Sequence, residues 1–334
     1  MSANPAESEA SLGDWFETLL ALDPDQRLAR LAALPPPLAS RLRALLDADA
    51  ESDAGIDVAL RRDAAATIAP ELSGQRIGSW RVVRELGSGG MGTVLLAERD
   101  EGGFTQQAAI KLIRGFPSQD GMRRLRQERQ ILAQLDHPDI ARLIDGGETE
   151  AGQPYLVVEY VRGQTLAAYL QVWQPDRDAR IALIERIGAA VQHAHQHLVI
   201  HRDLKPSNVM VTDEGGIKLL DFGVAKLIAA GDSDLQGSTR VFTPGYASPE
   251  QAAGRTVGIA TDIYSLGVML REALGQKPVD AELSGIIAKA TAHQVADRYG
   301  TVAAFCDDLS RYRRGLPISA AAIARQVVAK GGDH

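Results

Sequence analysis

The stretch His201–Asn208 restricts the fold and chemistry of this chain more than any other part of the sequence. It reads His-Arg-Asp-Leu-Lys-Pro-Ser-Asn and fits H-R-D-x-x-x-x-N, a pattern that gathers several polar side chains at one site. In this pattern Asp203 orients a hydroxyl nucleophile and accepts its proton, Lys205 neutralises a transferring phosphate, and Asn208 ligates Mg²⁺. The stretch therefore predicts phosphoryl transfer to a hydroxyl group.

An Asp-Phe-Gly motif begins at Asp221, directly after the apolar stretch 217–220. Mg²⁺ prefers oxygen ligands, so Asp221 and Asn208 are suited to share one cation with the phosphates of a nucleotide. Three residues alone could match by chance, but their position shortly after the first motif makes the match specific. We therefore predict Asn208 and Asp221 as the metal ligands.

A glycine cluster fits the pattern G-x-G-x-x-G-x-V, in which missing Cβ atoms let the backbone close over a polyphosphate. A hairpin turn or a dinucleotide-binding fingerprint would also explain the glycines. A dinucleotide site needs a helix to open at its third glycine, whereas residues 94–97 follow as a strand. We therefore predict antiparallel strands joined by a loop that covers a nucleotide. The loop residues are Leu86, Gly87, Ser88, Gly89, Gly90, Met91, Gly92 and Val94.

Lys111 follows the glycine cluster within an apolar stretch that is typical of a strand. An unpaired ammonium is costly to bury, so this lysine needs an anionic partner. Glu128 lies centrally in the next stretch of helical periodicity and is the natural partner. Either residue alone would more often be a surface charge, but their order after the glycines predicts a pair that holds the α- and β-phosphates.

The charge balance argues against a general nucleic-acid surface. The formal net charge is −7, whereas such a surface needs clustered Lys and Arg. The single cysteine, Cys306, cannot form an internal disulfide, which fits a reducing compartment. We find no secretion signal and no apolar run near the roughly 20 residues that span a bilayer. We therefore expect a cytoplasmic chain, and leave open a membrane segment beyond His334 in a longer parent protein.

Periodicity and composition divide the chain into five segments. Apolar residues at helical spacing predict a small helical module at 1–50, and a stretch rich in Ala, Asp and Arg predicts a linker at 51–74. A β-rich part at 75–161 and a mainly helical part at 162–317 follow, and a tail at 318–334 ends the chain. Helices are expected in particular over 123–135, 181–197, 260–274, 283–292 and 302–313.

The ordered motifs together resemble the eukaryotic-type (Hanks-type) serine/threonine protein kinases of bacteria. The match runs from Gln75 to Pro317. It implies an α+β, two-lobed protein kinase fold with a β-rich N-lobe and a helical C-lobe, preceded by the small helical N-terminal segment. It also implies an ATP-dependent enzyme that uses Mg²⁺, or Mn²⁺ as an alternative, and acts on Ser/Thr hydroxyls of protein substrates.

The resemblance also assigns residues around the nucleotide. Val158 takes the gatekeeper position, and the segment from Glu159 to Val161 takes that of the hinge, which pairs with adenine. Four apolar residues would sandwich the base: Leu86, Val94, Ala109 and Met210. Four others would stack as a spine that couples the two lobes: Leu132, Leu143, His201 and Phe222.

The segment Thr243–Glu250 resembles the part of these kinases that receives the substrate, with Ser-Pro-Glu in place of Ala-Pro-Glu. Similar proteins pair this glutamate with a later arginine, which Arg298 matches. Asp262 matches a buried aspartate that anchors the catalytic loop. Lys205 and Thr243 together indicate Ser/Thr specificity.

An arginine beside the catalytic aspartate often receives a phosphorylated activation segment, and Arg202 has this position. We therefore expect autophosphorylation, for which a dimer acting in trans is one arrangement. The segment 221–250 contains four candidate hydroxyls: Ser233, Ser238, Thr239 and Thr243. Ser238 and Thr239 are the predicted phosphosites, whereas Thr243 is predicted to contact Asp203 and Lys205.

One departure from the family pattern leaves other functions open. The chain runs from Gly275 to Asp280 almost directly into a later helix, so the helix αG, which docks substrates in similar kinases, is missing or reduced. A pseudokinase or nucleotide-binding scaffold is therefore an alternative, although the complete set of catalytic groups weighs against it. A small-molecule kinase is a third reading, which the segment ending in Ser-Pro-Glu disfavours.

Three alternating histidines precede the catalytic loop: His193, His195 and His197. They raise the alternative of a metal site. Alternate positions on a helix do not share a face, and no Cys or carboxylate cluster accompanies them. Ordinary histidines at a helix end are the favoured interpretation.

Overall fold

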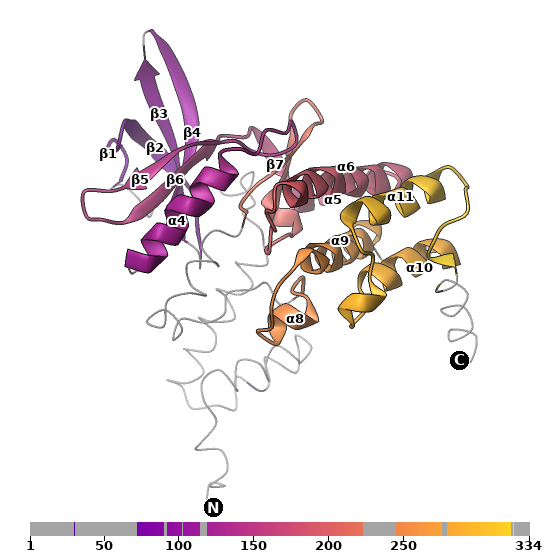
Figure 1. Cartoon of the computed structure of the whole chain (residues 1–334). Helices are drawn as coiled ribbons and strands as arrows, with labels where there is room; N and C mark the ends of the chain where they lie inside the picture. Colours follow the sequence, from indigo (N-terminus) through magenta and orange to yellow (C-terminus); the bar gives the residue numbers. More distant parts are fainter. Residues whose placement is uncertain are drawn as a thin grey trace, which may run out of the picture. The chain divides into compact units, whose positions relative to one another are not determined.

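The computed structural model describes residues 30, 72–89, 92–101, 103–113, 119–222, 245–275, 279–321 and 323. The chain divides into two compact units, Met1–Ile56 and Asp57–His334, and every element named below belongs to the second (Figure 1). The helical module predicted at 1–50 lies outside the described residues except for Arg30, so it stays a prediction. The same holds for most of the predicted linker and tail.

The N-lobe is a six-stranded antiparallel sheet with the order β1-β2-β3-β4-β6-β5. Strands β2 and β3 form the hairpin that the glycine cluster predicts, and helix α4 lies beside the sheet (Figure 1). The elements are β1 (Arg76–Ile77), β2 (Trp80–Gly89), β3 (Gly92–Glu101), β4 (Phe104–Ile113), α4 (Gln119–Leu132), β5 (Leu143–Glu148) and β6 (Pro154–Glu159).

Alternation along β4 gives the sheet two apolar faces. Ile110 packs with the fully buried Trp80 on one face, and Ile113 packs with Leu125 of α4 on the other. Successive side chains of a strand point to opposite faces, so Lys111 lies on the same face as Ile113. The sheet therefore directs Lys111 to the α4 side, away from the Trp80 core.

The C-lobe is mainly helical. Its helices are α5 (Leu166–Trp173), α6 (Arg177–Gln196), α8 (Pro249–Ala252), α9 (Ile259–Leu274), α10 (Ala281–Ala290) and α11 (Val302–Arg313). Short 3-10 turns lie at Pro206–Asn208 and Val295–Asp297. A small sheet has the order β7-β8-β9, formed by β7 (Gly163–Thr165), β8 (Val209–Thr212) and β9 (Ile217–Leu219). The catalytic loop connects α6 to this sheet.

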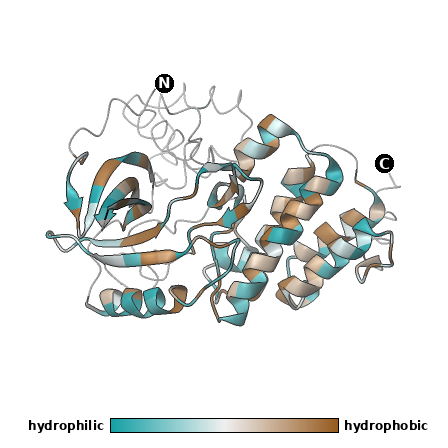
Figure 2. Cartoon of the chain, turned by 90° about the horizontal axis from the view of Figure 1, so that it is seen from above, coloured by the Kyte–Doolittle hydropathy of each residue, from teal (hydrophilic) through white to brown (hydrophobic). Residues whose placement is uncertain are grey.

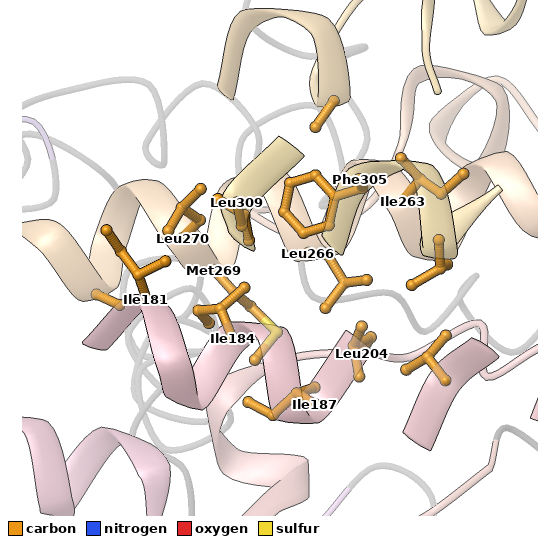
Figure 3. Close-up of a cluster of buried hydrophobic side chains, with 14 of the residues drawn as sticks. Ile181, Ile184, Ile187, Leu204, Ile263, Leu266, Met269, Leu270, Phe305 and Leu309 are labelled. Atoms are coloured by element: carbon orange, nitrogen blue, oxygen red, sulfur yellow. The ribbon is translucent and has the colours of Figure 1, made fainter. Parts of the chain in front are cut away.

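One apolar core joins the helices of the C-lobe. Figure 3 shows side chains of α6, α9 and α11 meeting in this core. Burying one such side chain contributes about 1.5–3 kcal/mol relative to leaving it exposed. The labelled residues are Ile181, Ile184, Ile187, Leu204, Ile263, Leu266, Met269, Leu270, Phe305 and Leu309. This core holds α6 and α9 in position relative to each other, and the catalytic loop follows α6 along the chain.

Side-chain caps determine where several predicted helices begin. Asp176, Asp280 and Thr301 each accept a hydrogen bond from the backbone N–H three residues later, at the starts of α6, α10 and α11. The predicted helices agree with the observed ones to within a few residues at each end. Helix α4 begins earlier than predicted, at Gln119, and ends earlier, at Leu132.

The connection between α9 and α10 is short, as predicted. Helix α9 ends at Leu274, and Asp280 already caps α10. Gly275 has a φ of 68°, in the left-handed region that favours glycine, and this conformation ends α9. The described residues of this connection, Gly275, Val279 and Asp280, are not helical.

Hydropathy differs between the helix beside the sheet and the other elements. Figure 2 shows hydrophobic residues gathered on the helices of the C-lobe and along the strands, whereas the helix beside the sheet is largely hydrophilic. That helix is α4, whose exposed surface carries Arg123, Arg124 and Arg126. Within the part of the chain that the structure describes, no helix is both long and apolar enough to cross a membrane.

Candidate active site

The catalytic loop is anchored by Asp262 of α9. The Asp262 carboxylate is fully buried and accepts hydrogen bonds from the backbone N–H groups of His201 (2.8 Å) and Arg202 (2.9 Å). The same carboxylate lies 2.7 Å from Nε2 of His195 on α6. The anchoring role that the family resemblance implies for Asp262 is therefore confirmed by its contacts.

Asp203 and Asn208 lie against each other at the end of this loop, and both are buried. Nδ2 of Asn208 donates hydrogen bonds to the backbone oxygen (2.7 Å) and to Oδ2 (3.1 Å) of Asp203. Nζ of Lys205 lies 3.8 Å from Oδ2 of Asp203. Because the amide nitrogen of Asn208 is engaged, its oxygen is the atom that suits a cation, which fits a magnesium ligand.

Lys111 and Asp221 form an ion pair between the two lobes, with Nζ 2.9 Å from Oδ1. Leu220, the residue before Asp221, donates its backbone N–H to the carbonyl of Asn208 at 2.8 Å. Asn208 in turn contacts Asp203. A continuous series of contacts therefore joins four predicted residues from three separate parts of the sequence.

The predicted pairing of Lys111 with Glu128 is wrong for this structure. Among the described residues the ion pair of Lys111 is with Asp221. Burial raises the pKa of the Glu128 carboxyl, and the positive charge of Arg202 opposes this rise. The positive charge that acts on the Glu128 carboxyl therefore comes from Arg202 of the catalytic loop. Periodicity located the strand and the helix, but the distance between the two side chains depends on how α4 packs against the sheet.

The four predicted spine residues lie together. The rings of His201 and Phe222 have centroids 4.8 Å apart, and Nε2 of His201 lies 2.8 Å from the carbonyl oxygen of Leu220. Phe222 and Leu143 pack against the apolar cluster that contains Leu132 of α4. Complete burial lowers the pKa of His201, which favours the neutral imidazole. The spine therefore connects α4 to the catalytic loop, as the resemblance implies.

The register of the N-lobe sheet brings predicted nucleotide-binding residues together. Val94 of β3 is paired with Gly87 of β2 and with Lys111 of β4. Ala109 of β4 is paired with Val158 of β6, which precedes the predicted hinge. These residues form adjacent rungs of one sheet, so they can line one surface.

Other residues predicted to bind the nucleotide differ in how deeply they are buried. Gly92 closes the β2–β3 hairpin with a φ of 135°, a conformation that requires glycine. Met210 is buried on β8, while Leu86 and Val161 are half-buried. The predicted residues that lie outside the described part of the chain are Gly90, Met91, Ser233, Ser238, Thr239 and Thr243.

Glu250 and Arg298 form the buried ion pair that the resemblance implies. Two parallel hydrogen bonds of 2.8 Å join the guanidinium to the carboxylate, and Thr261 donates a third at 2.9 Å. Burial by itself would raise the pKa of Glu250, but the hydrogen bonds from Arg298 and Thr261 outweigh it and lower the pKa to about 2. The pair therefore fixes the start of α8, beside the segment predicted to receive substrate.

The three alternating histidines separate as their spacing predicts. His195 faces Asp262, whereas the ring of His193 packs at a tilt against those of His197 (4.5 Å between centroids) and His137 (4.9 Å). In the part of the chain that the structure describes, no group of three or more His, Cys, Asp or Glu side chains is arranged to hold a metal ion. The sequence reasoning missed the role of His195, for which its place one helical turn before the catalytic loop was the available signal.

The sequence reasoning also missed Lys218 of β9. Its Nζ donates a hydrogen bond to Oε2 of the hinge residue Glu159 at 2.9 Å, and the backbone N–H of Arg142 donates to the same oxygen at 3.2 Å. Lys218 directly opposes the predicted adenine neighbour Met210 across the β8–β9 pair. A lysine in an otherwise apolar strand was the signal that could have drawn attention to it.

Comparison with known proteins agrees with this geometry. The family model of the protein kinase domain matches residues 80–309. The serine/threonine-protein kinase PrkC of Bacillus subtilis is 39% identical, over 65% of this chain and 34% of that protein. The serine/threonine-protein kinase PknB of Mycobacterium tuberculosis is 36% identical, over 70% of this chain and 42% of that protein. The chain thus spans less than half the length of these relatives.

Solved structures give the same result. The kinase domain of PknI from Mycobacterium tuberculosis superposes with a TM-score of 0.58 and 27% identity, covering 72% of this chain and 98% of that one. The family model matches residues that include the strands from β2 to β9, the helices from α4 to α10, the first part of α11, the catalytic loop and the buried Glu250–Arg298 pair. The chain therefore belongs to the protein kinase domain family, in its bacterial Hanks-type serine/threonine branch.

Proposed function

We propose that this chain is a serine/threonine protein kinase that transfers the γ-phosphate of Mg·ATP to Ser and Thr hydroxyls of proteins. The observation that carries this proposal is the series of contacts from Lys111 through Asp221 and Asn208 to Asp203. Residues that ligate phosphate, metal and hydroxyl in a phosphoryl transfer have to meet at one place. Here they meet between the two lobes.

Each residue of the series has a distinct task. Lys111 binds the α- and β-phosphates, and Asp203 orients the acceptor hydroxyl and takes its proton. Lys205, 3.8 Å from Asp203, neutralises charge on the transferring group. Asn208 and Asp221 would hold Mg²⁺, or Mn²⁺ as an alternative, which would supply electrostatic stabilisation of the phosphates.

Two features favour protein acceptors. The described end of the segment that closes with Ser-Pro-Glu is anchored by Glu250 to Arg298, which would hold a platform for protein substrates in place. Lys205 matches the residue that Ser/Thr-specific relatives use. Autophosphorylation of the activation segment, in trans between two copies, belongs to the same proposal.

A nucleotide-binding scaffold is the second candidate function. The short link between α9 and α10 favours it, because its described residues contain no counterpart of a helix that docks substrates in related kinases. The complete polar set around Asp203 favours catalysis instead, since a scaffold has no need to keep a buried Asp203 next to Asn208. The scaffold would bind Mg·ATP without transferring phosphate.

Transfer of labelled γ-phosphate to a test protein distinguishes these functions. The wild-type chain should label Ser and Thr, whereas the Asp203→Asn variant should transfer about 10²–10⁴-fold more slowly. Both should bind Mg·ATP equally in calorimetry, because Asp203 acts on the acceptor. Equal labelling by both proteins would refute the catalytic assignment. Nucleotide binding with no transfer by either would support the scaffold, and labelling of a sugar or an antibiotic alone would support a small-molecule kinase.

A further inference from the structure

We propose that Gln251 of α8 is a positioning residue for Asp203, because it holds the backbone of Arg202 and so links the end of the activation segment to the catalytic loop. This inference rests on the proposed kinase function. The side-chain amide Nε2 of Gln251 donates a hydrogen bond to the carbonyl oxygen of Arg202 at 2.8 Å. Arg202 is the residue immediately before Asp203.

The backbone of Arg202 needs support from outside the loop. Its φ of 65° lies in the left-handed region, which costs free energy for any residue with a Cβ atom. Such a conformation persists at functional sites only where surrounding contacts over-determine it. The direction of Asp203 depends on this residue, because the chain enters Asp203 through the Arg202 peptide group.

Two hydrogen bonds hold Arg202 from opposite sides. Its N–H donates to Oδ1 of Asp262 at 2.9 Å, and its carbonyl oxygen accepts from Gln251 at 2.8 Å. One bond lies before the Cα atom and the other after it, so together they restrain both backbone torsions. Asp262 belongs to the core of the C-lobe, whereas Gln251 belongs to the segment that follows Ser-Pro-Glu.

The Gln251 side chain is itself held in place. Its Oε1 accepts the backbone N–H of Ser248 at 3.2 Å, and Oγ of Ser248 accepts the backbone N–H of Gln251 at 3.4 Å. This reciprocal arrangement is a capping box, in which Glu serves as well as Gln. Only the amide of Gln has an N–H that can also donate to the Arg202 carbonyl. The bond to Arg202, rather than the capping box, is therefore what requires Gln at position 251.

The consequence is a direct path from the activation segment to the catalytic aspartate. A shift of Ser248 would move Gln251, and Gln251 would then release the carbonyl of Arg202. The buried pair of Glu250 with Arg298 holds the same short helix. Placement of the substrate segment and of Asp203 would therefore change together.

The test compares two substitutions at one position. Gln251→Glu keeps the cap but places a carboxylate oxygen against the Arg202 carbonyl, and Gln251→Ala removes both bonds. We expect kcat to fall about tenfold in both variants, with the KM for ATP within about twofold of wild type. Gln251→Glu should melt close to the wild-type temperature, because its capping bond remains.

A matched control separates positioning from stability. Thr301→Ala removes the cap of α11, in which the Thr301 side chain accepts a hydrogen bond from the backbone N–H of Ala304 at 3.1 Å. Thr301 is far from the catalytic loop in the sequence, and its capping bond does not involve that loop. It should lower the melting temperature and leave kcat unchanged. Wild-type kcat in the Gln251→Glu variant, or a tenfold loss in Thr301→Ala, would overturn the positioning role while the kinase function stands. Absence of transfer by the wild-type chain would instead overturn the proposed function.

Discussion

Two ion pairs of this chain have the same chemistry and opposite surroundings. Lys111 and Asp221, between the lobes, share one contact of 2.9 Å, and 13% and 35% of their side-chain surfaces are exposed. Arg298 and Glu250, inside the C-lobe, share two contacts of 2.8 Å, with 0% and 6% exposed. Arg298 also donates to the carbonyl oxygens of Ala260 and Ala292.

The difference indicates what each pair is for. A fully buried charge must have all its hydrogen bonds satisfied, because desolvation costs several kcal/mol per ion. Arg298 meets that condition and cannot change partners without unfolding its surroundings. Lys111 keeps access to solvent and has donors to spare, so it can exchange a carboxylate for a phosphate. We therefore infer that the buried pair stabilises the fold and that the accessible pair takes part in the proposed reaction.

Breaking the buried pair should have the largest effect on stability. Arg298→Met leaves the Glu250 carboxylate buried without its partner, which we expect to lower the free energy of unfolding by about 3–5 kcal/mol. Urea unfolding followed by circular dichroism measures the loss. A loss below about 1 kcal/mol would show that the pair is no more structural than an exposed one.

Breaking the accessible pair should reverse this pattern. Lys111→Met should reduce phosphate transfer about 10²–10³-fold, since it removes a charge that acts on the phosphates. The free energy of unfolding should change by less than about 1 kcal/mol, because the pair is partly exposed. Transfer rates and urea unfolding measured on the same preparation give both numbers. A large stability loss with activity retained would contradict the comparison.

The buried pair also predicts a pH dependence with a definite sign. The pKa of Glu250 is about 2 in the folded chain, below its ordinary value of 4.5. Its contribution to stability is therefore complete above the unfolded value and is lost as the pH falls from 4.5 toward 2. Unfolding free energies measured from roughly pH 5 to pH 3 should fall more steeply for wild type than for Glu250→Gln. Equal slopes would remove the claim that hydrogen bonds lower this pKa.

A third pair, about as exposed as Lys111 and Asp221, should give the smallest effects. Lys218 and Glu159 have 18% and 33% of their side-chain surfaces exposed, and they join β9 to the hinge. Lys218→Met should lower stability by about 0.5–1 kcal/mol and raise the KM for ATP a few-fold through a looser hinge. Steady-state kinetics at varied ATP concentration tests this. A drop in kcat with KM unchanged would place Lys218 in the chemical step instead.

Much of the site could be predicted from the sequence because its motifs are local. The spacing within His201–Asn208 fixes which residues share one loop, and the alternation around Lys111 fixes which face of its strand it occupies. The short link after α9 was also visible, because Asp280 begins a new helical pattern too soon for another helix to fit. These properties depend on neighbours in the chain.

The remainder depends on packing between elements. The partner of Lys111 is set by the position of α4 against the sheet, which periodicity along α4 does not contain. The link from Gln251 to the catalytic loop depends on the backbone conformation of Arg202, and sequence patterns assign no φ to an arginine. His195 has a role only because α9 brings Asp262 beside it. Residues of this kind are found from contacts, not from motifs.

The most direct test of the account is a structure of the chain with Mg²⁺ and a non-hydrolysable ATP analogue. We predict that Nζ of Lys111 leaves Asp221 for a phosphate oxygen and that oxygens of Asp221 and Asn208 ligate the metal, while the Glu250–Arg298 pair stays as it is. A nucleotide bound elsewhere, or phosphates that lie beyond the reach of Lys111 and Asp203, would contradict the account.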